Sequence, residues 1–283
     1  MAGTLYLCAT PIGNLQDMTP RVADTLRSVD LIAAEDTRNS IRLLNHFDIH
    51  TPMTSYHEYN RVEKGHELIR LLQEGKDIAL ITDAGTPAIS DPGEVLVRMC
   101  AEAGIRVTSL PGPAACITAL TLSGLSTRRF CFEGFLPFEN KKELKAVLEE
   151  LKEETRTIIL YEAPHHLIRT LTCLEEALGE RRVTLCRELT KKFETVFPTT
   201  IREALRYYDT QAPRGEYVLV IEGKSRQEKE QEQQAAFSEM SMEEHMDLYE
   251  GQGLDRKEAM KRVAKDRGIS RREVYQYFLE RRG

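Results

Sequence analysis

Residues 82–93 read Thr-Asp-Ala-Gly-Thr-Pro-Ala-Ile-Ser-Asp-Pro-Gly and follow directly on the apolar run Ile-Ala-Leu-Ile at 78–81. A short apolar run bounded by turn residues is typical of a buried strand. Glycine lets a backbone approach a ligand closely, and proline restricts a loop before anything binds. Because α/β proteins bind ligands in loops that follow buried strands, the stretch predicts an α/β fold with a binding loop here. Taken alone, the motif also fits an ordinary tight connection.

Strands alternate with helices on both sides of this loop. Thr19 is the expected N-cap of a first helix that starts at Pro20, and Val62, Ile69 and Leu72 share one face of a later helix. The alternation predicts a largely parallel sheet that is covered on both faces. In this half of the chain we expect strands at 5–9, 31–34, 77–82 and 106–110, and helices at 61–74 and 92–103.

The pattern resumes after Pro137, and a break near 125–138 separates it from the first half. We therefore predict two α/β domains, at residues 1–125 and 126–223. In the second we expect helices at 140–153 and about 165–178, and strands at 156–161, 182–187 and 217–221.

The C-terminal part has a different composition. Residues 224–240 are rich in Gln, Glu and Lys and are predicted to form a solvated linker. Within residues 241–283 we expect two short basic helices, at about 255–266 and 270–281, joined by a turn at Gly268. Ser270 and Glu273 have capping-box spacing. This helix-turn-helix layout favours nucleic-acid contact; the alternative is a basic hairpin that packs on the body or on another subunit.

Charge is unevenly distributed along the chain. The net charge is −6, but residues 256–283 contribute +6 and the remaining residues −12. Such contrast suggests a separate binding role for the basic part. No apolar run approaches the ~20 residues of a membrane helix, and the N-terminus lacks the charged region of a signal peptide. We therefore expect a cytoplasmic protein with no membrane partner.

Several kinds of site are not predicted. The six cysteines are scattered without a Cys-x-x-Cys pair, which favours reduced core thiols over disulfides or zinc ligands. His165 and His166 have no metal-ligand partner at helical spacing, so we expect surface histidines and no metal site. The chain contains neither a P-loop motif nor a Gly-x-Gly-x-x-Gly fingerprint after the first strand, and no Gly-x-Ser-x-Gly elbow.

Loops at the ends of the expected strands remain as candidates, and several could converge on one crevice. The most polar of them, Glu35-Asp36-Thr37-Arg38, suits proton handling or binding of a hydroxyl-bearing substrate. A helix N-terminus, where the helix dipole favours acids, explains the same residues equally well. The loops in question are 10–15, 35–38, 83–93, 111–115, 161–164 and 188–194.

Seven motifs occur in a fixed order and together carry a resemblance. They are Ala-Thr-Pro-Ile-Gly-Asn-Leu at 9–15, Ala-Glu-Asp-Thr-Arg at 34–38, the 82–93 loop, Leu-Pro-Gly-Pro-Ala at 110–114, Glu-Gly-Phe-Leu-Pro at 133–137, Tyr-Glu-Ala-Pro-His at 161–165 and Gly-Glu-Tyr at 215–217. The chain closely resembles the ribosomal RNA small subunit methyltransferase I family of the tetrapyrrole-methylase superfamily. The resemblance covers about residues 3–223, and the C-terminal basic helices match a segment often found after it. One departure is His166, where the family often has Arg.

The resemblance implies two α/β domains with S-adenosylmethionine bound in the cleft between them. It implies methyl transfer to the ribose 2′-hydroxyl of a cytidine in the decoding region of 16S ribosomal RNA, by a homodimer. Glu35 and Asp36 are candidates for the base or for orienting the ribose, and Arg38 for neutralising an RNA phosphate. His57 and Lys191 are weaker candidates. By motif position, the cofactor contacts are Pro11, Asp83, Gly85, Thr86, Ala88, Ala114, Ala115, Tyr161, Glu162 and Leu189.

Asp83 could instead cap its own loop, and Tyr161 could be a core residue. Two other functions remain open at this point. A tetrapyrrole methyltransferase of the same superfamily would need a roomy apolar cleft and no basic appendage. A non-catalytic regulator that reads nucleic acid with its helix-turn-helix would leave the strand-end loops without a role.

Overall fold

The computed structural model describes residues 2–225, 227–229, 234, 235, 237 and 239–280. The chain divides into two compact units. The first contains Met1–Lys152 and Arg156–Glu222, and the second contains Glu153–Thr155 and Gly223–Gly283. Among the described residues, no helix combines the length and the apolar character needed to cross a bilayer.

The first sheet has five parallel strands in the order β3-β2-β4-β1-β5, as the alternating pattern predicts. The four predicted strands are present, and β3 is additional because its three residues contain no apolar run to signal it. The strands are β1 (Thr4–Cys8), β2 (Leu31–Ala34), β3 (Met53–Ser55), β4 (Ile78–Ile81) and β5 (Arg106–Leu110).

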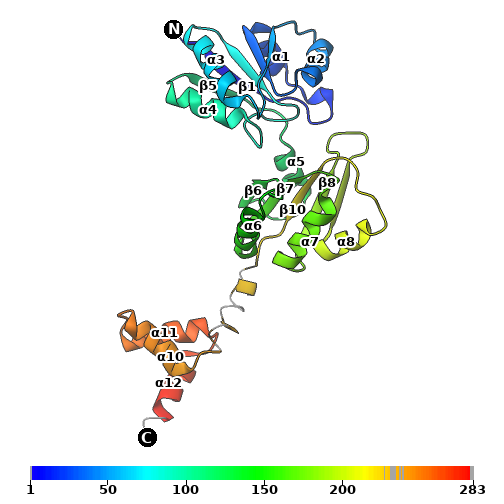
Figure 1. Ribbon diagram of the computed structural model, residues 1–283. Coiled ribbons are helices and arrows are strands. Elements are labelled where there is room, and N and C mark those ends of the chain that lie inside the picture. Colours follow the sequence, from blue (N-terminus) through cyan, green and yellow to red (C-terminus); the bar gives the residue numbers. More distant parts are fainter. Residues whose placement is uncertain (1, 226, 230–233, 236, 238, 281–283) are drawn as a thin grey trace. The chain divides into compact units, whose positions relative to one another are not determined.

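Helices cover both faces of this sheet (Figure 1). Leu26 and Leu44 pack from α1 and α2 on one face, and Leu68 and Leu96 from α3 and α4 on the other. The hydroxyl of Thr19 accepts a hydrogen bond from the Val22 N–H at 3.2 Å, which confirms the predicted cap. The helices are η1 (Leu15–Asp17), α1 (Pro20–Ser28), α2 (Thr37–His46), α3 (Arg61–Gln73) and α4 (Gly93–Glu102).

One detail of the predicted α3 face is wrong. Val62 is 60% exposed, whereas Leu68 and Leu72 are fully buried. Val62 lies in the first turn of the helix, where the chain has just left the loop, so its apolar side chain finds no partner in the core.

The second sheet departs from the parallel pattern. Its order is β6-β7-β10-β8-β9, and only β6 and β7 are parallel. β10 lies antiparallel between β7 and β8, and β8 pairs with β9 in antiparallel register. The β8–β9 connection is short enough for a hairpin, whereas a parallel crossover needs a dozen or more residues. The strands are β6 (Phe130–Gly134), β7 (Thr157–Glu162), β8 (Arg182–Arg187), β9 (Thr195–Thr200) and β10 (Tyr217–Ile221).

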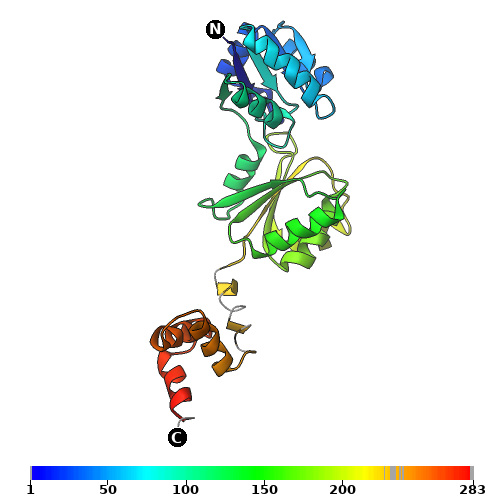
Figure 2. The ribbon, with the colours of Figure 1, turned by 60° about the vertical axis from the view of Figure 1, so that its left-hand side comes forward.

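The helices of this region are divided unequally between the faces of the second sheet (Figures 1 and 2). α6 (Lys141–Glu153), α7 (Leu167–Leu178) and α8 (Ile201–Tyr208) share one core with the sheet. α5 (Ala115–Leu122) packs on the opposite face through Cys116, Ala119 and Leu120. α5 therefore packs on the second sheet although it precedes the boundary that we propose at residue 125.

Within residues 239–280 of the C-terminal unit, three helices surround a small core of their own. α11 (Arg256–Asp266) and α12 (Arg271–Glu280) match the two predicted helices, and α10 (Met242–Gly251) is additional. The Glu273 N–H donates to the Ser270 hydroxyl at 3.2 Å and the Ser270 N–H to the Glu273 carboxylate at 2.6 Å, which confirms the capping box. The predicted linker at 224–240 falls partly outside the described residues.

Candidate functional site

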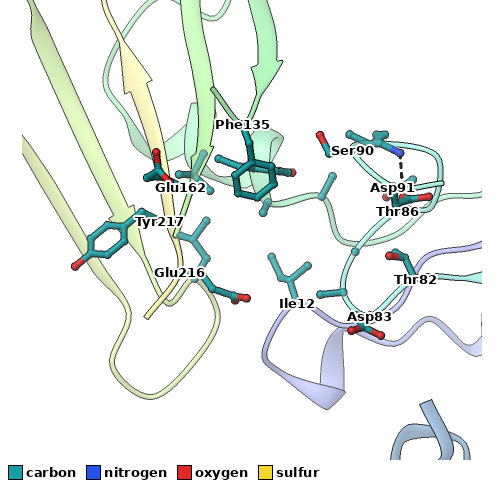
Figure 3. A pocket seen from close by; sticks show the side chains of 18 of the residues that line it. Ile12, Thr82, Asp83, Thr86, Ser90, Asp91, Phe135, Glu162, Glu216 and Tyr217 are labelled. Carbon is teal, nitrogen blue, oxygen red and sulfur yellow. Dashed lines mark hydrogen bonds between the residues drawn. The ribbon is translucent and has the colours of Figure 1, made fainter. Parts of the chain in front are cut away.

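Loops from both sheets of the first unit enclose a cavity of about 390 Å³. That volume lies within the range of small-molecule sites, roughly 300–1,000 Å³. Figure 3 shows side chains of the first sheet's loops, among them Thr86 and Asp91, facing Phe135 and Glu216 from the second. The site is therefore made where strand-end loops of the two sheets meet.

Gly85 joins three of these loops. Its N–H donates to the Thr10 carbonyl at 3.0 Å and its carbonyl accepts from the Thr10 N–H at 2.9 Å. The neighbouring Thr86 hydroxyl donates to the Pro113 carbonyl at 2.9 Å. Gly85 has a φ of +85°, and a Cβ here would lie 3.3 Å from the side chain of Ile12. The backbone conformation therefore favours glycine here, and a side chain would in addition press on Ile12.

Asp91 holds the rest of the same loop. Its carboxylate accepts hydrogen bonds from the N–H groups of Ala88, Ile89 and Gly93, at 3.0, 3.2 and 2.7 Å. These bonds stabilise a segment in which Ala88 and Ser90 adopt positive φ values of 67° and 60°. Non-glycine residues adopt this region at a cost, so the loop is fixed before any ligand arrives.

Glu35 and Asp83 place two carboxylates at one side of the cavity. Glu35 Oε2 accepts from the Thr82 hydroxyl at 2.6 Å. Asp83 accepts from the N–H of Asp36 at 3.3 Å and from the Asn39 amide at 3.4 Å. Burial raises the pKa of Asp83, and the negative charge of Glu35 adds to the increase. The pair therefore concentrates negative charge at the cavity wall.

Asp36 and Arg38 have a different arrangement, since neither lines the cavity. Asp36 is the N-cap of α2, and its Oδ1 accepts from the Arg38 N–H at 2.8 Å. Its two oxygens also accept from Arg38 Nε and Nη2 at 3.1 and 2.8 Å. These bonds to Arg38 lower the pKa of Asp36 to about 2. Asp36 is thus an ionised anchor for an exposed guanidinium.

The second sheet contributes aromatic and acidic side chains. The Tyr161 hydroxyl accepts from the Cys116 N–H at 3.2 Å, and its ring lies 5.7 Å from that of Phe135. Burial raises the pKa of Tyr161, which keeps the hydroxyl protonated. Glu162 is buried and accepts from the Ala163 N–H at 2.7 Å and from the Thr170 hydroxyl. Tyr161 and Glu162 therefore connect the cavity to α5 and α7.

Lys191 is the single lysine or arginine among the residues that line this cavity. Its Nζ lies 3.0 Å from Glu188 Oε1 and 3.1 Å from Glu216 Oε2. The positive charge of Lys191 is thus paired with these two carboxylates. The other carboxylates that line the cavity leave it acidic as a whole.

The cavity collects most, but not all, of the residues that the motifs indicated. Glu35 from the catalytic set and Lys191 from the weaker candidates line it, whereas Pro11, Ala88, Asp36, Arg38 and His57 do not. The cofactor candidates that line it are Asp83, Gly85, Thr86, Ala114, Ala115, Tyr161, Glu162 and Leu189.

Sequence reasoning missed other lining residues. Phe135, Glu216 and Tyr217 lie inside quoted motifs at strand ends, so a signal for them was available. Ser90 and Asp91 belong to the 82–93 loop itself. Ile12 lies inside the motif at 9–15 and Glu188 in the candidate loop at 188–194, whereas Cys186 carried no signal that separated it from its neighbours. Within the described residues there is no group of three or more His, Cys, Asp or Glu side chains that could hold a metal ion.

The fold and the cavity define an α/β protein of two sheets with an acidic small-molecule site formed by strand-end loops. Comparison with known proteins narrows this class. The model of the tetrapyrrole (corrin/porphyrin) methylase family matches residues 4–205. The chain belongs to this family and, within it, to the ribosomal RNA small subunit methyltransferase I family.

Relatives are similar over nearly their whole length. The chain is 49% identical to ribosomal RNA small subunit methyltransferase I of Synechocystis sp., over 98% of both chains. It is 47% identical to the protein of that name from Bacillus subtilis, over 96% of this chain and 93% of the other. The Escherichia coli O157:H7 protein is 44% identical, over 99% of this chain and 96% of the other.

Solved structures share the fold at low identity. Diphthine synthase superposes with a TM-score of 0.63 at 12% identity, covering 78% of this chain and 90% of the other. The methyltransferase CobJ gives a TM-score of 0.58 at 19% identity, covering 77% and 94%. These likenesses establish the two-sheet tetrapyrrole-methylase fold and nothing about the substrate.

Proposed function

We propose that this protein transfers a methyl group from S-adenosylmethionine to the ribose 2′-hydroxyl of a cytidine in 16S ribosomal RNA of the small subunit. The observation that carries the proposal is the 49% identity, over 98% of both chains, to a protein named as a small-subunit ribosomal RNA methyltransferase. The choice of cytidine and of the 2′-oxygen rests on the motif resemblance.

The chemistry of the cavity supports S-adenosylmethionine as the ligand. The cofactor carries a positive sulfonium and an ammonium group, and the cavity presents the carboxylates of Glu35 and Asp83. Small residues at its wall, Gly85, Ala114 and Ala115, let a large ligand approach the backbone. Pro11 and Ala88 do not line the cavity and would contribute indirectly. Pro11 precedes the lining residue Ile12, and Ala88 lies in the loop that Asp91 stabilises.

When bound, the cofactor supplies an electrophilic methyl group, and the chain must hold the acceptor hydroxyl in line with it and accept a proton. Positioning supplies roughly 7–11 kcal/mol, and a general base about 10²–10⁴ in rate, so positioning carries most of the acceleration. Glu35 lines the cavity and is our candidate for the base or for orienting the ribose. Asp36, with its pKa of about 2, is a weak base, and we assign it to holding Arg38 against an RNA phosphate.

We further propose a cytoplasmic homodimer. All six cysteines are free thiols, which fits a reducing compartment. Ile117 and Leu122 on α5 and Phe130 on the edge strand β6 are exposed large apolar side chains, which supports a contact between two copies. Light scattering at micromolar concentration measures the oligomeric state, and a monomer would contradict this part.

Mass-spectrometric mapping of ribose methylation tests the proposed function. Small subunits or their RNA from cells that lack the protein are incubated with the purified protein and S-adenosylmethionine. We expect one new 2′-O-methylcytidine in 16S RNA. A protein that methylates a porphyrinoid but leaves the RNA unmodified would overturn the proposal, and so would a protein that binds RNA but no S-adenosylmethionine.

A further inference from the structure

A second cavity, of about 300 Å³, lies at the ends of β8 and α8 in the first unit. Two of its lining residues carry guanidinium groups, two carry phenols, and none is acidic. The wall thus has a charge opposite to that of the first cavity. Its lining residues are Arg187, Tyr207, Tyr208, Gln211, Ala212 and Arg214.

The two cavities are built from the same two segments of chain. Along β8, Cys186 lines the first cavity and Arg187 the second, because successive side chains of a strand point to opposite faces. In the segment before β10, Arg214 lines the second cavity and Glu216 the first. Residues that line the two cavities are therefore only one or two positions apart in the sequence, which corresponds to at most about 7 Å along the backbone.

Tyr217 connects the two sites. Its backbone belongs to the segment that borders the first cavity, whereas its hydroxyl accepts from the Arg214 N–H at 3.2 Å and lies 3.3 Å from the Tyr208 hydroxyl. Figure 3 shows the Tyr217 ring directed away from Glu216 and the other labelled side chains. Burial raises the pKa of Tyr208, and its neutral hydroxyl donates to the hydroxyl of Tyr217.

Arg187 presents a donor that the protein does not use. Its Nε is buried, yet it has no hydrogen-bond partner among the described residues. The nearest acid in sequence, Glu188, lines the first cavity and accepts there from Lys191 and from the Glu216 N–H at 3.0 and 3.1 Å. A buried donor without a partner is unfavourable, which indicates that a ligand with acceptor oxygens belongs here.

We propose that the second cavity binds a phosphodiester of the RNA substrate, close to the nucleotide that is methylated. The inference rests on the proposed function. Guanidinium groups bind phosphate oxygens in a two-bond fork, which suits Arg187 and Arg214. The two cavities lie on opposite faces of the second sheet, but residues that line them are one or two positions apart at the ends of its strands. An RNA strand that passes these strand ends with a ribose in the first cavity therefore brings a nearby phosphate to the second.

A salt series with matched variants tests this site. The affinity of the full-length protein for a small-subunit RNA fragment is measured from low to high salt for Arg187→Gln, Arg214→Gln and the control Arg206→Gln. Arg206 is exposed on α8 and lines neither cavity. We expect each cavity variant to lower the slope of log affinity against log salt by about one, and the control to keep the wild-type slope.

Two further measurements keep the result interpretable. Calorimetry with S-adenosylmethionine should give wild-type affinity for all three variants, which shows that the first unit remains folded. Arg187→Lys keeps the charge but cannot form the fork, so we expect a nearly wild-type salt slope with weaker binding. A slope in Arg214→Gln equal to that of Arg206→Gln would overturn the proposal.

A free phosphate ion has the same chemistry as the phosphodiester, and a titration with inorganic phosphate separates the two. Phosphate binding that is lost in both cavity variants, with an unchanged RNA slope, would assign the cavity to the free ion and overturn the RNA site. The proposed function can be contradicted independently of this site. If the cavity variants reduce the salt slope of RNA binding but the protein transfers no methyl group to RNA, the phosphate site is supported and the proposed function is not.

Discussion

The part of the chain that holds the cofactor cavity and the C-terminal helices carry opposite charges. Residues 1–222, which contain the cavity, sum to −6, and residues 256–283 sum to +6. Carboxylates of Glu35, Asp83 and Glu216 line the cavity of the first unit, whereas α11 and α12 of the second unit carry exposed arginines and lysines. An acidic site favours a cationic donor but repels RNA. Affinity for RNA must therefore come from other surfaces.

The two units also differ in how they are held. The cavity depends on loops fixed by long-range bonds, such as those of Gly85 with Thr10. The C-terminal unit depends on local capping boxes at Ser241 and Ser270 and on a few buried apolar side chains. If donor binding and RNA binding are divided in this way, changes in one unit should leave the ligand of the other unaffected.

Gly85→Val is expected to have the largest effect, a loss of methyl-donor binding to the first unit. Valine is strained at a φ of +85°, and its side chain would meet Ile12 and the Pro113 carbonyl. We expect no measurable S-adenosylmethionine binding by calorimetry, and no methyl transfer. The control is Gly104→Ala, which has a φ of +66° with no atom within 4 Å of the new Cβ. It should cost some stability and keep cofactor affinity; wild-type affinity in Gly85→Val would place the cofactor elsewhere.

Asp36→Ala should separate chemistry from cofactor binding. Loss of the carboxylate frees Arg38, which it holds through bonds of 3.1 and 2.8 Å, and Asp36 does not line the cavity. We expect turnover to fall by on the order of 10²-fold, the size of effect of a misplaced group, with unchanged affinity for S-adenosylmethionine. Arg38→Gln should cause a similar loss, and Asp24→Ala, at an exposed position of α1, none. Wild-type turnover in Asp36→Ala would remove the residue from the mechanism.

The sequence was sufficient to predict elements whose signal lies within a few neighbouring residues. The apolar run at 78–81 with its Gly/Pro loop located β4 and the cavity wall, and the Ser-x-x-Glu spacing located α12. The same Ser-x-x-Glu signal at Ser241 and Glu244 marks α10, which the sequence reading overlooked.

Long-range geometry was not readable in this way. Glu35 and Asp36 are neighbours with similar chemistry, yet Glu35 turns to Thr82 of another strand's loop and Asp36 turns to its own helix. Strand direction in the second sheet is equally hidden, because the fully buried run of β10 reads the same in either direction. Contacts that join distant segments decide both outcomes.

Deletion of residues 240–283 tests the RNA side of the comparison. Because this segment contains the ten arginines and lysines of residues 256–283, we expect RNA affinity to fall by roughly an order of magnitude at moderate salt. The salt dependence should become flatter, by about 0.9 in slope for each lost phosphate contact. Cofactor affinity should not change. Unchanged RNA affinity would instead assign these helices to packing between subunits.

His245 gives the smallest expected effect, confined to the C-terminal unit. The side chain is fully buried, its Nδ1 accepts from Arg267 Nε at 3.1 Å, and its ring stacks on Phe237 at 4.2 Å. Burial lowers the pKa of His245 and the charge of Arg267 lowers it further, although Asp266, 3.8 Å from Nε2, opposes them. Protonation would also remove the acceptor that Arg267 uses.

The lowered pKa fixes the direction of the pH dependence. Below about pH 6.5 the unfolded state binds a proton that the folded state resists, so the stability of this unit should fall as the pH drops further. Amide hydrogen exchange of residues 242–280 at pH 7.5 and 5.5 measures this. His245→Phe keeps a ring against Phe237 but cannot titrate, so it should flatten the dependence, whereas exposed His66→Gln should not. Equal pH dependence in wild type and His245→Phe would show that another group controls the stability of the C-terminal unit.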